Sequence, residues 1–127
     1  MFQIMLVFVG GGLGSVARLL TNRLVQNVLP TNLSPLGTLA SNLTASFILG
    51  VFVGFATWRQ PAQTQTLRAL IAVGFCGGFS TFSTFSHDTL QLFQTNRWAE
   101  ALLNIFINVT ACLALTLAGI WLGKQCA

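Results

Sequence analysis

Four long stretches of predominantly apolar residues alternate with short polar segments along the chain. The stretches cover approximately residues 3–24, 36–57, 68–93 and 99–123. Each is long enough for a helix that crosses a bilayer, which needs about 20 such residues. The three tryptophans fall at the ends of these stretches, at the headgroup level that an indole ring prefers: Trp58, Trp98 and Trp121. The pattern therefore predicts an all-α membrane protein, in which residues 1–127 form a single transmembrane domain of four helices.

The composition agrees with this class and excludes several others. Hydrophobic residues make up 54% of the chain and charged residues only 6%, whereas a soluble domain carries about 25% charged residues. The net charge of +4 does not indicate a nucleic-acid-binding protein, because the basic residues are scattered singly rather than clustered. The three cysteines include no C-x-x-C pair, so the sequence supports neither a disulfide framework nor a zinc site.

The positive charges are divided evenly between the two sides of the predicted domain. Four spans place both chain ends on one side, together with Arg59, Arg68 and Lys124. The opposite side carries Arg18, Arg23 and Arg97. The positive-inside rule needs an imbalance to set the orientation, so the sequence is compatible either with a weak bias or with insertion in both orientations. In the second case, a homodimer with one inverted protomer would form an inverted repeat with sites near the bilayer midplane.

Glycines are concentrated in the first span, at Gly10, Gly11, Gly12 and Gly14. Their spacing does not match the G-x-G-x-x-G fingerprint of dinucleotide-binding proteins, and no acidic partner follows at the required distance. Small residues instead let membrane helices approach one another closely. We therefore expect the first span to pack tightly against another helix.

The third span contains the unusual stretch FCGGFSTFSTFS, residues 75–86. Its glycine pair, Gly77 and Gly78, should weaken the helix in the middle of the membrane. Non-helical backbone persists at that depth only where protein buries it or where it lines a site. A break would free carbonyls that can hold a cation, while the following half-helix presents its amides. The sequence thus predicts a third helix that is broken near its middle.

Phenylalanines recur at every third position in this stretch, at Phe79, Phe82 and Phe85. Hydroxyl residues such as Ser83 and Thr84 fill the gaps and can bond back to carbonyls four residues earlier. A phenyl ring has a negative face and a positive edge. Rings presented edge-on would attract an anion without a full charge. The alternative is that these rings only pack against other side chains and lipid.

Amide and hydroxyl side chains lie within two other spans. Asn42 in the second span needs a partner at this depth, either another helix or an anion in a conduction path. The fourth span places four such residues on one face, because they are four positions apart: Asn104, Asn108, Cys112 and Thr116. A polar face on a membrane helix is directed toward protein or a water-filled path rather than toward lipid.

The stretch GFCGGFSTFSTFS, with GGGLGSVAR at 10–18 and GTLASN at 37–42, resembles the fluoride channel family known as Fluc or CrcB. The resemblance covers essentially the whole chain. It implies an antiparallel, dual-topology homodimer with two fluoride pores in the cell membrane, which in bacteria is the inner membrane. It also implies that the protein lets fluoride leave the cell passively and thereby lowers the toxicity of cytoplasmic fluoride.

The resemblance also implies roles for individual residues. The fluoride pore would be lined by Asn42, Phe82, Phe85, Ser83, Thr84, Asn104, Asn108, Cys112 and Thr116. Arg18 would attract anions to a vestibule, and the carbonyls of Gly77 and Ser80 would hold a central structural Na⁺. The chain departs from the family pattern at three positions, where Ala45 replaces a common glycine, Asp88 a commoner glutamate and Cys112 a usual serine.

Other functions explain the sequence less well. A small dual-topology multidrug or cation exporter, the main alternative, exchanges protons at a carboxylate inside the membrane, but both acidic residues, Asp88 and Glu100, lie near span ends. A membrane assembly subunit would account for the glycines but not for the polar face of the fourth span. No nucleophile–base pair or metal-binding cluster indicates an enzyme.

Overall fold

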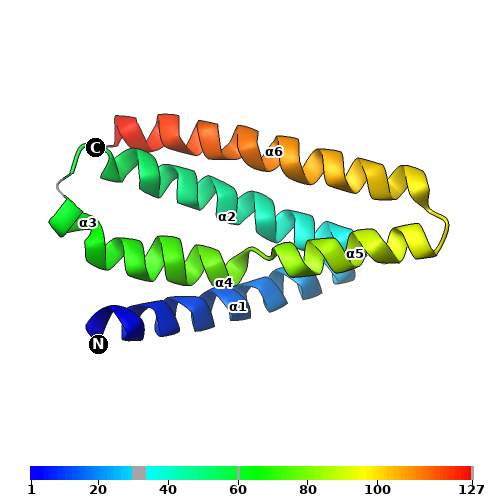
Figure 1. The fold of residues 1–127 in the computed structure, drawn as a ribbon, viewed down its shortest axis with the longest axis horizontal. Coiled ribbons are helices and arrows are strands. Elements are labelled where there is room, and N and C mark those ends of the chain that lie inside the picture. The colour runs from blue at the N-terminus through cyan, green and yellow to red at the C-terminus, as the bar shows by residue number, and fades with distance from the viewer. Residues whose placement is uncertain (30–33, 60, 127) are drawn as a thin grey trace.

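The computed structural model describes residues 1–29, 34–59 and 61–126 (Figure 1). Within these ranges every regular element is a helix, in the order α1 (Phe2–Val28), α2 (Ser34–Ala56), α3 (Pro61–Leu67), η1 (Arg68–Cys76), α4 (Gly77–Phe79), α5 (Phe82–Gln94) and α6 (Trp98–Gln125). Four segments are long and apolar enough to cross a membrane: Phe2–Val28, Pro35–Ala56, Thr64–Gln94 and Trp98–Gln125. The predicted all-α membrane class with four membrane-spanning segments is therefore confirmed.

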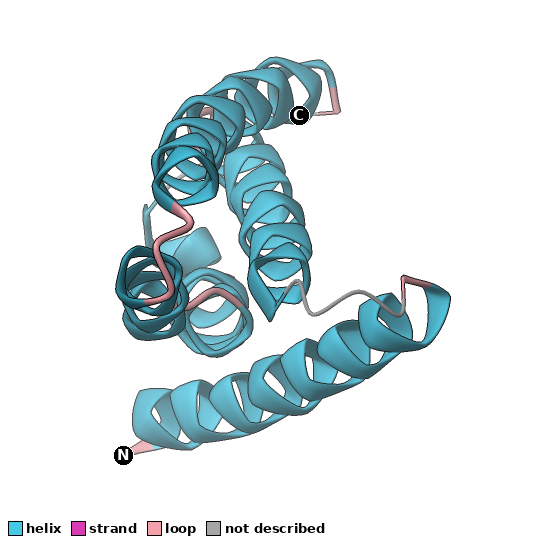
Figure 2. Ribbon diagram, turned by 90° about the vertical axis from the view of Figure 1, so that its right-hand side faces the viewer, coloured by secondary structure: helices cyan, strands magenta, loops and turns pink. Residues whose placement is uncertain are grey.

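The helices form two closely packed pairs. The most extensive contacts join α2 to α6, and α1 to η1 and α4. Both chain ends lie at the same end of the bundle, as an even number of spans requires (Figure 1). Figure 2 shows α1 and α6 on opposite sides of the bundle, with α2 and the third span between them. The third span therefore lies where its residues can form a site together with residues of α2 and α6.

Glycine backbone contacts hold both pairs together. In the α2–α6 pair, a Cβ on Gly54 would collide with the Ile120 carbonyl, and one on Gly123 with the Val51 carbonyl. In the other pair, a Cβ on Gly14 would collide with the Phe75 carbonyl. Such contacts let helix backbones approach one another in a way that larger residues prevent. The tight packing that we expected from the glycines of the first span is present, and a second glycine contact joins α2 to α6.

A tight turn connects α5 to α6. Asn96 adopts a φ of 60°, in the left-handed region that asparagine tolerates better than most residues. The Arg97 N–H donates to the Leu92 carbonyl at 2.8 Å and ends α5. The rings of Phe93 and Trp98 meet edge-on with centroids 5.0 Å apart. This turn directs α6 back along α2 and brings the polar residues of α6 opposite α5.

The third span is interrupted between α4 and α5, at Ser80 and Thr81. Ser80 has φ −80° and ψ 157°, and Thr81 has φ −155° and ψ 116°, so both are extended. We expected the weak point at Gly77 and Gly78. That position was wrong, because Gly77 is helical at φ −63° and ψ −36° and Gly78 lies within α4. A Cβ on Gly78 would collide with the Gly11 carbonyl, so this glycine serves helix packing.

The contact between α1 and the third span can be tested with two neighbouring glycines. In Gly14→Ala, the new methyl group would lie 2.8 Å from the Phe79 nitrogen. We expect this substitution to lower the stability of the fold by about 1–3 kcal/mol. Thermal unfolding in detergent micelles measures the effect.

Gly12→Ala is the matched control, because a Cβ on Gly12 has nothing within 4 Å. Alanine favours a helix over glycine by about 1 kcal/mol, so this variant should be at least as stable as the parent. Equal destabilisation by both substitutions would contradict the packing role of Gly14.

Candidate functional site

A cavity of about 240 Å³ lies beside the interruption of the third span. Residues from α2, the interruption, α5 and α6 line it: Asn42, Ser46, Ser80, Thr81, Phe82, Phe85, Asn108, Val109 and Cys112. None of these lining residues is an aspartate, glutamate, lysine, arginine or histidine. The cavity instead combines amide and hydroxyl groups with two aromatic rings.

Asn42 connects the interruption to α6. Its Oδ1 accepts a hydrogen bond from the Thr81 N–H at 2.9 Å, and its Nδ2 donates to Asn108 Oδ1 at 3.2 Å. A backbone N–H can only donate, so this contact fixes which end of the Asn42 amide faces Thr81. Of the two alternatives for Asn42, the bond to another helix is therefore present. The Nδ2 carries a second N–H, and Asn42 itself lines the cavity.

The hydrogen bonds continue along α6 and back to α5. Asn108, which is 5% exposed, donates from Nδ2 to Asn104 Oδ1 at 2.9 Å. Asn104 Nδ2 donates to Thr89 Oγ1 at 2.9 Å, and that hydroxyl donates to the Phe85 carbonyl at 2.7 Å. We call this series of bonds, from Thr81 through Asn42, Asn108 and Asn104 to Thr89, the amide ladder. It joins α2, α5 and α6 and holds their polar groups in fixed orientations.

Thr81 caps the beginning of α5. Its Oγ1 accepts from the Thr84 N–H at 3.3 Å, which is the usual contact of an N-cap threonine. The same hydroxyl lies 3.1 Å from both Ser83 Oγ and Thr84 Oγ1. On the other side of the interruption, Ser80 donates from its N–H to the Cys76 carbonyl at 2.9 Å. The hydroxyls of the stretch thus satisfy the backbone around the interruption.

The three phenylalanines that recur at every third position have different surroundings. Phe79 is 5% exposed and its ring lies 5.4 Å from the Phe75 ring, so it is a packing residue. Phe85 is 9% exposed and lines the cavity, whereas Phe82 lines the cavity with a side chain that is 79% exposed. The Phe82 and Phe85 rings are 5.5 Å apart and tilted by 48°. An every-third-residue pattern could not distinguish these roles.

The remaining residues that we predicted for the site lie outside this cavity. Thr116 donates to the Cys112 carbonyl at 2.9 Å and to the Ser46 carbonyl at 3.4 Å, so it joins α6 to α2. Arg18 is partly buried on α1 and does not line the cavity. The roles of these residues in conduction stay predictions.

The backbone at the interruption suits a hard cation. In a continuous helix the Thr81 N–H would donate to the Gly77 carbonyl, and the Thr84 N–H to the Ser80 carbonyl. Here these two donors bond to Asn42 and to the Thr81 hydroxyl instead. The carbonyls of Gly77 and Ser80 are thus released from those bonds, and carbonyl oxygens of unwound helices coordinate Na⁺ in transporters. Two carbonyls from one protomer do not complete a coordination shell.

Three residues that organise the site were not predicted from the sequence to do so. Thr81 supplies both the amide bound by Asn42 and the cap of α5. Its position three residues beyond the glycine pair was the available signal. Thr89 completes the amide ladder. Asp88, which we placed near a span end, is 3% exposed and accepts from the Thr38 hydroxyl at 2.7 Å. The bond between Asn104 and Thr89 links residues 15 positions apart, and the bond between Thr38 and Asp88 links residues 50 positions apart.

Substituting Asn42 tests how much the interruption depends on it. In Asn42→Ala the Thr81 N–H loses its acceptor, and Thr81 is only 9% exposed. An unsatisfied buried donor costs about 1–3 kcal/mol. We expect the variant to unfold at a correspondingly lower temperature in detergent micelles.

Thr110→Ala, on α6, provides the control. Thr110 is exposed, and its hydroxyl donates to the Phe106 carbonyl at 2.6 Å within α6. This variant should unfold within about 0.5 kcal/mol of the parent, as surface substitutions do. If the two variants were equally stable, the bond to Thr81 would not be important for the fold.

Comparisons with known proteins point to one family. The family model described as "CrcB-like protein, Camphor Resistance (CrcB)" matches residues 5–120. Relatives named "Fluoride-specific ion channel FluC" occur in Escherichia coli O139:H28 (strain E24377A / ETEC), O9:H4 (strain HS) and strain SMS-3-5. Each is 46% identical over 128 residues, which cover 96% of this chain and 94% of the relative.

Proposed function

Because this chain belongs to the CrcB family, we propose that it is a fluoride-specific ion channel through which fluoride leaves the cell passively. Its relatives at 46% identity carry that name, and its four membrane-capable helices make it a multi-pass membrane protein. The single observation that carries the proposal is the cavity at the helix interruption, which offers amide, hydroxyl and aromatic groups together. By letting fluoride leave across the bacterial inner membrane, the channel lowers the toxicity of fluoride in the cytoplasm.

Fluoride is small and strongly hydrated, so a pore must replace the water that the ion leaves behind. An isolated ion in an apolar medium costs tens of kcal/mol. In this chain the second Nδ2–H of Asn42 and the hydroxyl of Ser46 are available at the cavity wall. The Ser80 hydroxyl already donates to the Cys76 carbonyl at 2.8 Å. The positive edges of the Phe82 and Phe85 rings add weak attraction. Each group is neutral, so none holds the anion strongly enough to stop its release.

The membrane potential supplies the driving force for this passive transport. Moving one elementary charge across 100 mV is worth about 2.3 kcal/mol. In a cell with a negative interior, this drives an anion outward. No proton-coupled cycle is needed, and the cavity contains no carboxylate that could serve one. The buried Asp88 lies instead on α5 against Thr38, outside the set of residues that line the cavity.

The proposal includes an antiparallel homodimer. Three basic side chains lie on each side of the domain, which is compatible with insertion in both orientations. The Phe82 side chain is 79% exposed on the single protomer although it lines the cavity. An inverted second protomer would cover this ring and complete the wall of the pore. It would also bring a second pair of Gly77 and Ser80 carbonyls toward the first pair.

The proposal further includes a structural Na⁺ at this junction. Gly77 and Ser80 of both protomers would hold it through their carbonyl oxygens. The backbone donors that would bond to these carbonyls in a continuous helix bond to Asn42 and to the Thr81 hydroxyl instead. When bound, the ion supplies positive charge that ties the carbonyls of two chains together. It has no role in moving fluoride.

Fluoride efflux from liposomes that contain the purified protein tests the function. The parent should release fluoride and retain chloride. Phe82→Ile and Phe85→Ile should each reduce the fluoride rate by at least about tenfold, because isoleucine has no positive ring edge. A fluoride-selective electrode measures the release.

Phe79→Ile is the control for a phenylalanine that only packs. Phe79 lies 5.4 Å from the Phe75 ring and outside the cavity, so its loss should lower stability by about 1–3 kcal/mol but leave selective efflux. Retention of fluoride by the parent protein would refute the proposed function. Unchanged flux in both pore variants would refute only the role of the ring edges.

The orientation of the two protomers has its own test. Two added lysines beside Arg59 should favour one orientation, and two added beside Arg97 should favour the other, because the present balance is even. Each variant expressed alone should lose most fluoride efflux, and co-expression should restore it. Full efflux from either variant alone would contradict the antiparallel homodimer.

A further inference from the structure

A groove of about 660 Å³ lies between the first turns of α1 and the junction of α3 with η1. It is separate from the cavity at the interruption and shares no lining residue with it. Its polar lining consists of Gln3, Gln65 and Arg68. Its apolar lining includes Ile4, Phe8 and Val73. The groove therefore has two chemically different parts, and the proposed function uses neither.

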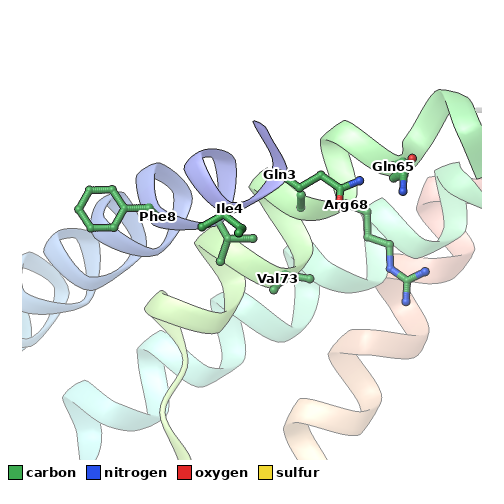
Figure 3. A pocket seen from close by; sticks show the side chains of 8 residues that line it. Gln3, Ile4, Phe8, Gln65, Arg68 and Val73 are labelled. Atoms are coloured by element: carbon green, nitrogen blue, oxygen red, sulfur yellow. The ribbon is translucent and has the colours of Figure 1, made fainter. Parts of the chain in front are cut away.

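The two parts are arranged along the length of the groove. Figure 3 shows Gln3, Gln65 and Arg68 together on one side, near the junction of α3 with η1. Ile4 and Val73 follow, and Phe8 lies farthest from the polar group (Figure 3). Arg68 is the fifth residue of the membrane-capable segment Thr64–Gln94, so the polar part lies near its end. The groove thus runs from a polar end near the membrane surface to an apolar part deeper in the bilayer.

Among the described residues, Arg68 forms no ion pair. Both side-chain carboxylates lie toward the other end of the bundle, on α5 and α6 (Figure 1). Glu100 forms an ion pair with Arg97 through two contacts, one of them 2.7 Å between Nε and Oε1. Asp88 accepts from the Thr38 hydroxyl. The Arg68 side chain is exposed and lines the groove.

We propose that this groove binds an anionic phospholipid. The Arg68 guanidinium donates to the phosphate, which its planar set of N–H groups fits well. The amides of Gln3 and Gln65 supply further donors beside it. An acyl chain lies against Ile4, Phe8 and Val73. The order of polar and apolar lining matches the order of headgroup and chain in one lipid molecule.

Arg59 distinguishes this site from general attraction to a negative membrane. It also lies at the end of the bundle that holds the chain termini, where its guanidinium stacks over the Phe55 ring at 4.9 Å. It does not line the groove. A basic residue near an anionic membrane surface adds about 1 kcal/mol to the electrostatic attraction between protein and membrane. Both arginines therefore contribute to this diffuse attraction. Of these two arginines, only Arg68 lies beside an apolar groove that can hold an acyl chain.

Lipid binding by the full-length chain in mild detergent tests the proposal. Phosphatidylglycerol and phosphatidylcholine with identical acyl chains are titrated, and native mass spectrometry counts the bound lipid. The parent and Arg59→Gln should prefer phosphatidylglycerol. Arg68→Gln should weaken phosphatidylglycerol binding by about fivefold, as expected for one charge. Ile4→Trp, which fills the apolar part, should weaken binding of both lipids.

Several outcomes would overturn the proposal. Equal binding of the two lipids by the parent would exclude the proposed selectivity for an anionic lipid, because both lipids carry a phosphate and they differ in net charge. Equal losses in Arg59→Gln and Arg68→Gln would reduce the effect to diffuse attraction. Efficient cross-linking of Val73→Cys to a second chain, above the level in the parent, would show that another copy covers the groove. None of these results would affect fluoride efflux, so the proposed function is tested separately.

Discussion

The hydrogen bond from the Thr81 N–H to Asn42 Oδ1 is the interaction on which the site depends. Inside a bilayer no water is available for a backbone group that has left its helix, so protein must bind it. The interruption at Ser80 and Thr81 creates this problem, and a side chain 39 residues earlier solves it at 2.9 Å. Because the oxygen of Asn42 is committed to Thr81, its nitrogen is directed toward Asn108 and the cavity.

The glycine contacts explain how this bond is possible. Asn42 can reach both Thr81 and Asn108 only if α2, the third span and α6 run close together. Gly54 and Gly123 provide that closeness between α2 and α6. Gly14 and Gly78 hold α1 against the third span, and α2 contacts η1, α4 and α5 of that span. Packing and polar chemistry are therefore coupled, since a larger side chain at a contact would also move the donors that line the cavity.

The site achieves an attractive environment for an anion with neutral groups. A buried positive side chain would bind fluoride strongly but would also hold it, and would itself be costly in the membrane. The amide ladder fixes several dipoles at once, because each amide both accepts and donates. Two bonds to Asn104 orient Asn108, which in turn orients Asn42. Fixed dipoles of this kind can replace water without the cost of reorganising around the ion.

The sequence by itself determined the class of protein, the four membrane-spanning segments and the stretch in which the site lies. These follow from apolar length, from the scarcity of charge and from a motif of neighbouring residues, all of which are local properties of the chain. The polar face of α6 also followed from spacing, because Asn104 and Asn108 are one helical turn apart.

Only the tertiary structure decided where the third span is interrupted. Spacing alone also did not separate Phe79 from the two rings that line the cavity, Phe82 and Phe85, which only the family resemblance had assigned to the pore. Glycine propensity indicated Gly77 and Gly78, but Gly78 is needed against Gly11, and the helix yields instead at Ser80 and Thr81, where Asn42 and the Thr81 hydroxyl bind the released amides. Phe79 and Phe82 look equivalent in the sequence, yet one is buried beside Phe75 and the other exposed. These outcomes depend on partners from distant segments, and local spacing holds no information about them.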